Sequence, residues 1–124
     1  MVAALAVWVA ISTIRERQRQ QHLATTRPAL NSSEFVRRFV AAGVDERVSD
    51  FIWTEFQPYY FAPLTPYPED RLISEMRIDG DDLSEMVTKF EKKFDRRWNG
   101  KWVGPDDPTL LDFAIALMNS TSEA

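Results

Sequence analysis

Residues 71–95 read RLISEMRIDGDDLSEMVTKFEKKFD, and the fold is inferred outward from this stretch. Between Gly80 and Phe94 the apolar residues recur three or four positions apart, which predicts an amphipathic helix. These residues are Leu83, Met86, Val87, Phe90 and Phe94. The helix is therefore expected to bury one stripe against a core and to leave its other side in water.

Charge divides this predicted helix into two halves. Its start is acidic, through Asp79, Asp81, Asp82 and Glu85, and the helix dipole favours negative charge there. Its end is basic, through Lys89, Lys92 and Lys93. Glu85 and Lys89 stand four positions apart and predict an ion pair. Two interpretations of the charges are open: a face that meets a partner protein, or a solvated helix face.

The same periodicity predicts three more helices. One runs from Ser33 to Ala42, with Asn31 or Ser32 as N-cap and Gly43 as its stop. A second runs from Asp45 to Gln57 and ends before Pro58. The last runs from Pro108 to Asn119, is apolar nearly all round, and takes Asp107 as its cap.

A long proline-containing loop, residues 58–78, separates the second helix from the acidic one. Strand-like alternation is absent from the sequence. We therefore predict that residues 33–120 form an all-α bundle with one long crossover loop.

The order of these elements resembles acyl carrier proteins over residues 45–118. In carriers a D-S-L motif opens the helix that follows the long loop, and its serine holds the phosphopantetheine arm. Asp79 stands at the aspartate of that motif, Gly80 at the serine and Asp81 at the leucine. FEKKFD at 90–95 is similar to the carrier "L-E-E-E-F-D", and TLLDFAIAL at 109–117 is similar to the final carrier helix.

The string Ile-Asp-Gly-Asp-Asp also resembles an uncharacterised bacterial family of carrier-like proteins in which it replaces the D-S-L motif. The resemblance implies a non-catalytic, carrier-like protein that acts by protein–protein contact and holds no phosphopantetheine, because Gly80 has no hydroxyl. The residues expected to take part are Asp79, Gly80, Asp81, Asp82, Glu85, Lys89, Lys92 and Lys93. The alternative is a working acyl or peptidyl carrier that uses another serine, such as Ser84.

Composition argues against several function classes. With one histidine, His22, and no cysteine, the chain lacks the side chains for a serine–histidine triad, a cysteine nucleophile or a histidine-rich metal site. Residues 28–124 hold 11 bases and 18 acids, a net charge of −7, which argues against nucleic-acid binding. The acidic cluster lacks the regular spacing of a calcium loop, so no metal is expected. An enzyme that uses Asp79, Asp81 and Asp82 stays open, and it would need an enclosed pocket.

The N-terminal segment, residues 1–17, begins with the uncharged run MVAALAVWVAISTI at 1–14, and arginines follow it. At about 1.5 Å per residue this run is shorter than a typical membrane span. Three interpretations remain: a short anchor on the cytoplasmic face of the inner membrane, the tail of a longer span, or a helix packed on the domain or a partner. Residues 18–32 are predicted to be a polar linker.

Aromatic residues are frequent in the predicted loops: Tyr59, Tyr60, Phe61, Tyr67, Trp98 and Trp102. We expect them to cover the core beneath the long loop. A patch that binds a partner is the competing interpretation.

Overall fold

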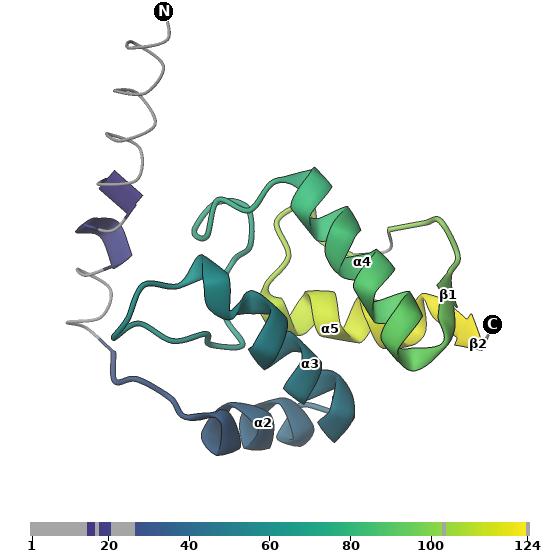
Figure 1. Cartoon of the computed structure of the whole chain (residues 1–124), viewed down its shortest axis with the longest axis horizontal. Coiled ribbons are helices and arrows are strands. Elements are labelled where there is room, and N and C mark those ends of the chain that lie inside the picture. Colours follow the sequence, from purple (N-terminus) through teal and green to yellow (C-terminus); the bar gives the residue numbers. More distant parts are fainter. Residues whose placement is uncertain (1–14, 17, 21–26, 103, 124) are drawn as a thin grey trace, which may run out of the picture.

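The computed structural model describes residues 15, 16, 18–20, 27–102 and 104–123. The apolar run 1–14 lies outside the described residues. The described part is mostly helical, with a small two-stranded sheet (Figure 1). The elements are α2 (Ser32–Ala41), α3 (Glu46–Phe56), η1 (Gln57–Tyr59), α4 (Gly80–Phe94), β1 (Arg96–Trp98), α5 (Leu110–Asn119) and β2 (Thr121–Glu123).

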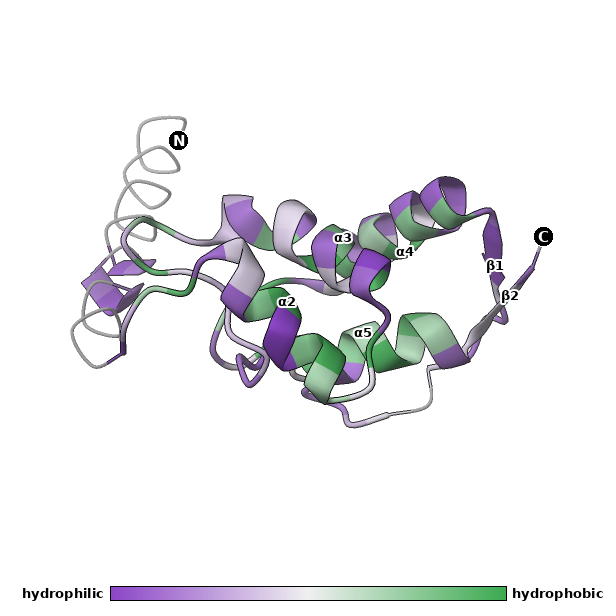
Figure 2. Cartoon of the chain, turned by 90° about the horizontal axis from the view of Figure 1, so that it is seen from below, coloured by the Kyte–Doolittle hydropathy of each residue, from purple (hydrophilic) through white to green (hydrophobic). Residues whose placement is uncertain are grey.

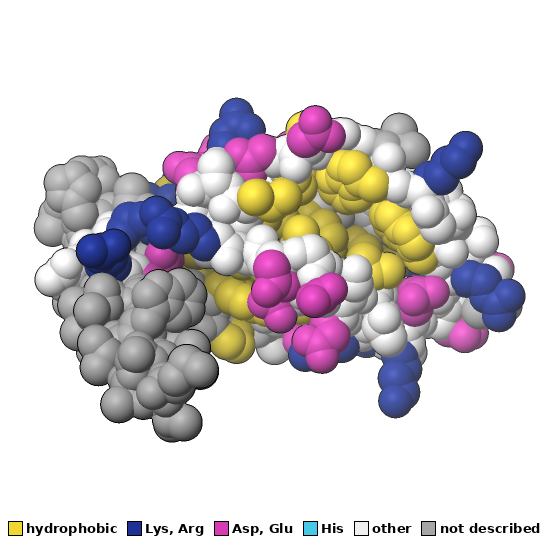
Figure 3. Space-filling view, turned by 90° about the horizontal axis from the view of Figure 1, so that it is seen from above, with side chains coloured by type: hydrophobic (Ala, Val, Ile, Leu, Met, Phe, Trp, Pro, Cys, Tyr) yellow, Lys and Arg dark blue, Asp and Glu magenta, His cyan; other side chains and the backbone are white. Residues whose placement is uncertain are grey.

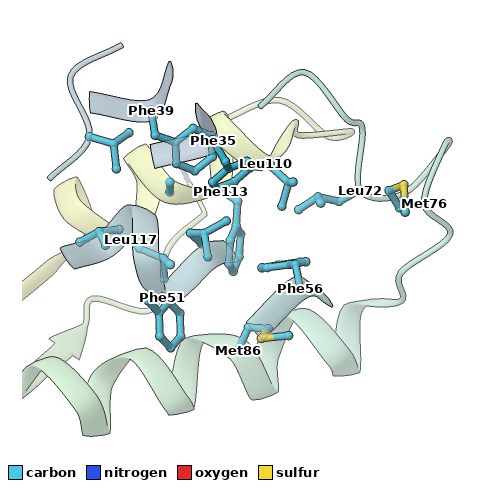
Figure 4. Packing of buried hydrophobic residues seen from close by; sticks show 14 of the residues in the cluster. Phe35, Phe39, Phe51, Phe56, Leu72, Met76, Met86, Leu110, Phe113 and Leu117 are labelled. Atoms are coloured by element: carbon cyan, nitrogen blue, oxygen red, sulfur yellow. The ribbon is translucent and has the colours of Figure 1, made fainter. Parts of the chain in front are cut away.

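One hydrophobic core joins α2, α3, α4, α5 and the long loop (Figure 4). Aromatic rings from different helices meet edge to face in it: Phe51 of α3 lies 5.6 Å from Phe90 of α4, and Phe56 of α3 lies 5.8 Å from Phe113 of α5. Burying a side chain of this size contributes about 1.5–3 kcal/mol to stability. The core therefore rests on contacts between helices.

The helix α5 lies deepest in the fold. Hydrophobic residues cover it almost all round, whereas α2, α3 and α4 show hydrophilic outer faces (Figure 2). Its buried residues are Leu110, Phe113, Ala114, Ala116 and Leu117. The prediction that the last helix is largely buried is confirmed.

The helix boundaries agree closely with the sequence for three of the four helices. The bounds of α4 are those predicted, and the Asp79 side chain caps it by accepting from the Asp82 N–H at 2.8 Å. Both ends of α2 and of α3 differ from prediction by one residue. Asn31 and Asp45 act as N-caps outside the helices, Ala42 is the C-cap of α2, and Gln57 belongs to the 3₁₀ turn η1. Pro58 lies in the 3₁₀ turn η1, directly after α3.

The predicted start of the last helix is wrong. α5 begins at Leu110, and its N-cap is Thr109, which forms a capping box with Asp112. Asp107 instead accepts the N–H groups of Ile73 and Ser74, at 3.2 and 3.1 Å, and so holds the long loop. The reciprocal pair of bonds at Thr109 satisfies two helix-start donors, which explains why it displaces the Asp-Pro signal.

The domain is mostly helical, as predicted, but a small sheet means that the all-α description is not confirmed. Arg96–Trp98 and Thr121–Glu123 pair as an antiparallel two-stranded sheet that joins the ends of α4 and α5. Each strand has three residues, too few for an alternating pattern to stand out in a sequence.

The long loop between η1 and α4 is fixed in place by backbone hydrogen bonds to the start of α5. The Leu72 N–H donates to the Pro108 carbonyl at 2.8 Å, and the Leu110 N–H donates to the Asp70 carbonyl at 2.9 Å. Apolar side chains of the loop enter the core: Leu64, Leu72, Met76 and Ile78. The loop is thus a structural layer of the domain.

A buried carboxylate, Asp70, lies at the centre of this loop. Arg27 contacts both of its oxygens, at 2.5 and 3.1 Å, and Tyr60 donates its hydroxyl at 2.5 Å. The Arg27 guanidinium also lies over the ring of Tyr67, 4.1 Å from its centre. Burial, followed by the charge and hydrogen bond of Asp70, raises the pKa of Tyr60.

Two side chains of the predicted linker, residues 18–32, bind the body of the domain. Arg27 does so through Asp70, and Gln20 is buried and bonds backbone groups on both sides of Tyr60. The Gln20 amide donates to the Tyr59 carbonyl at 2.9 Å and accepts from the Phe61 N–H at 2.7 Å.

In the part of the chain that the structure describes, we find no helix with the length and apolar character needed to cross a membrane.

We predict that Asp70→Ala lowers the free energy of unfolding by about 3 kcal/mol, because removing one partner leaves Arg27 as an uncompensated, largely buried charge. Urea denaturation followed by circular dichroism measures this change. The matched control is Glu69→Ala, at the exposed neighbouring position, which should shift stability by less than about 0.5 kcal/mol. Equal midpoints for the two variants would contradict the role given to Asp70.

Candidate functional site

The start of α4 lies at the surface. Gly80 is its first residue and is exposed, and a Cβ added there would meet no atom within 4 Å. Gly43 and Gly100 have positive φ angles, and Gly80 does not. The local geometry therefore admits a side chain at Gly80, and neither packing nor backbone conformation imposes the glycine.

Carboxylates surround Gly80. Asp79, Asp81 and Glu85 are exposed, and Asp82 is half-buried. Desolvation, followed by the like charges of Asp79, Glu85 and Asp81, raises the pKa of Asp82. Burial and then the charges of Asp82, Glu85 and Asp79 raise the pKa of Tyr59, which places this phenol beside the cluster. These acids form an open negative patch and lack the enclosed setting that carboxylate catalysis needs.

The second half of α4 is basic and differs in one respect from the sequence prediction. Lys89 pairs with Glu55 of α3 at 3.3 Å, whereas the predicted pair with Glu85 is not among the ion pairs of the described residues. Lys92 and Lys93 are exposed. Because Lys89 reaches across to α3, its ion pair joins the two helices.

A pocket of about 480 Å³ adjoins the start of α4. One wall is formed by four residues of α4 spaced at helical intervals: Gly80, Leu83, Ser84 and Val87. The other walls come from the loops before and after α4, from Trp98 of β1 and from Phe113 of α5. Figure 3 shows the hydrophobic side chains in a hollow on this face, with acidic side chains on both sides of it. Most of the wall is apolar, which is typical of ligand and docking sites.

Trp102 is one of the residues that line this pocket. Its ring stacks on Phe113 with centres 6.4 Å apart, and its indole N–H donates to the Pro105 carbonyl at 2.9 Å. It is nevertheless 40% exposed, and Ile73 on another wall is 46% exposed. Large apolar side chains left open in this way mark a contact or binding surface.

The predicted aromatic cover over the core is confirmed for part of its residues. Tyr60 and Tyr67 are buried, and Tyr59, Phe61 and Trp98 are partly buried. Trp98 and Trp102 line the pocket instead of covering the core completely. Both tryptophans were noted from the sequence, but their position beside α4 could not be predicted from it. The pocket brings together residues up to 40 positions apart, from Ile73 to Phe113.

Ser84 also lies in the pocket wall and is exposed, as predicted. In the part of the chain that the structure describes, we find no group of three or more acidic, histidine or cysteine side chains that could hold a metal ion.

No family model, curated protein or solved structure matches this chain.

We predict that Gly80→Ala raises the free energy of unfolding by about 0.4–1 kcal/mol, because alanine restricts the unfolded chain and meets open space in the helix. The matched control is Gly43→Ala. Gly43 has a φ of 97°, so the same change there should cost about 1 kcal/mol or more. Thermal denaturation of both variants measures the difference. A loss of stability at Gly80 as large as that at Gly43 would mean that the helix start requires glycine.

Proposed function

We propose that this chain is a carrier-like helical protein that lacks the phosphopantetheine serine and works by binding another protein, without catalysing a reaction. The observation that carries this proposal is the place of Gly80: it is exposed, it begins α4, and its surroundings would admit a serine. The site thus has room for a hydroxyl and lacks one.

The order of elements supports the carrier-like part of the proposal. A helix (α3), a long loop, a second helix (α4), a connection and a final helix (α5) follow one another as the resemblance to acyl carrier proteins implies. The two short strands and α2 are additions to that plan.

The exposed side of α4 is the proposed contact face. It carries the negative patch at its start, while Lys92 and Lys93 make its end positive. Charges of both signs along one helix favour a single orientation of a partner whose charges are arranged in the opposite order. Carriers meet basic enzymes with a uniformly acidic helix, so this arrangement fits a different partner.

The second candidate function is a working carrier modified at Ser84. The observation in its favour is that Ser84 is exposed, one turn after Gly80, in the wall of the same pocket.

We also propose that residues 1–14 attach the protein to the cytoplasmic face of the inner membrane, because an uncharged apolar run is followed by basic residues. If the attachment exists, the protein stays in the membrane pellet after carbonate extraction. Complete release into the supernatant would contradict the attachment.

We predict that the chain gains no phosphopantetheine mass when it is co-produced with a phosphopantetheinyl transferase of broad specificity. Intact-mass spectrometry checks this, with an ordinary acyl carrier protein in the same cells as the positive control. A gain that disappears in Ser84→Ala would replace the proposal with the second candidate. A gain that persists in this variant would place the arm on yet another serine.

We predict that reversing two charges on α4, in an Asp81→Lys, Glu85→Lys variant, lowers the yield of a specific partner about tenfold. Cross-linking in cells that produce the protein, followed by mass spectrometry, measures the yield. The control is Asp50→Lys, on the groove between α2 and α3, which leaves the face of α4 unchanged. Identical cross-linked proteins in identical amounts for all three chains would contradict the proposed contact face.

A further inference from the structure

The pocket beside α4 has the size and lining of a site for a small molecule. Its volume of about 480 Å³ lies within the range of about 300–1,000 Å³ that is usual for such sites. A compound with one ring or a short alkyl chain could occupy the space bounded by Leu83, Val87, Phe113 and the two tryptophans. Burial of apolar surface would supply most of its affinity.

The charge of the lining is one-sided. Asp106 is the one ionised side chain that lines the pocket among the described residues, and neither Lys nor Arg is among its lining residues. Asp106 is exposed, and no hydrogen bond or ion pair of its side chain occurs within the described residues. Its carboxylate is thus free to accept from a donor in the pocket.

The residues that flank the lining carry charges of both signs, with acids at the start of α4 and Lys101 between Gly100 and Trp102. Asp79 and Asp81 flank Gly80, which lines the pocket, and both are exposed. An anionic ligand would meet these carboxylates with no base among the lining residues to compensate, whereas a cation would be attracted to them.

The tryptophans add a second feature that favours a cation. Indole faces attract ammonium groups, and this attraction is strongest when the groups are partly removed from water. The Trp102 ring is held in place by its stack on Phe113 and its bond to Pro105. The backbone of Trp98 is held by its pairing in β1 and by its backbone N–H, which donates to the Glu91 carboxylate at 3.0 Å. Walls that are already fixed reduce the entropy lost on binding.

We propose that this pocket binds a small organic cation, made of an apolar ring or short chain that lies against α4 and the tryptophans and a protonated amine that faces Asp106. This site goes beyond the proposed function, because it does not depend on which protein meets the exposed side of α4. The cation site and the protein-contact face can each be disproved without affecting the other.

The test compares three compounds of nearly the same shape at neutral pH: 4-phenylbutylammonium, the neutral 4-phenylbutanol and the anionic 4-phenylbutyrate. Titration calorimetry of the full chain measures affinity, and two-dimensional NMR of the tryptophan indole groups reports the place of binding. We expect the cation to bind about fivefold or more tighter than the alcohol, and the anion to bind weakest. The signals of Trp98 and Trp102 should move, while that of Trp53, packed on α2, should not.

Variants separate charge from shape. Asp106→Asn should reduce the affinity of the cation about fivefold and leave that of the alcohol unchanged. This variant replaces an exposed side chain without described partners, so the fold should tolerate it. Asp50→Asn, which removes one carboxylate from another face, is the control and should bind all three compounds like the natural chain.

Four results would overturn the proposal. They are equal binding of the cation and the alcohol, no binding of any of the three compounds, unchanged cation binding in Asp106→Asn, and chemical-shift changes centred on Trp53.

Discussion

The carboxylate of Asp70 is the interaction on which the described structure depends most. Its oxygens bind Arg27 from the N-terminal side of the domain and Tyr60 from the start of the long loop, and its backbone carbonyl accepts the N–H of Leu110 at the start of α5. Three segments that are distant in the sequence are therefore tied at one residue. A buried charge is costly unless it is fully paired, so this cluster fixes one arrangement of the loop.

The position of the loop determines what lies next to α4. Because Leu72 is bonded to Pro108 and enters the core, the exposed Ile73 stands beside the connection that carries Asp106 and Trp102. The face of α4 therefore adjoins an open apolar pocket on one side and carries its own charges on the other. A helical scaffold arranged in this way offers the two separate surfaces proposed above, one for a protein and one for a small molecule.

The sequence predicted best what depends on neighbouring residues. The bounds of α4 follow from its apolar spacing and from Asp79, and Gly43 ends α2 as expected. Prediction failed where two local signals competed, as at Asp107 and Thr109, and where an element was too short to show a period, as in β1 and β2. It could not place Lys89 against Glu55 or Trp102 against Phe113, because these contacts depend on how helices and loops pack.

Asp107 gives the pocket a dependence on acidity. Hydrogen bonds from Ser74, followed by that from the Ile73 N–H, lower the pKa of this carboxyl. A group whose pKa is lower in the folded state contributes stability above its unfolded pKa and loses it as the pH falls through the folded value. Protonation would weaken the hydrogen bonds that Asp107 accepts from the turn at Ile73, which lines the pocket.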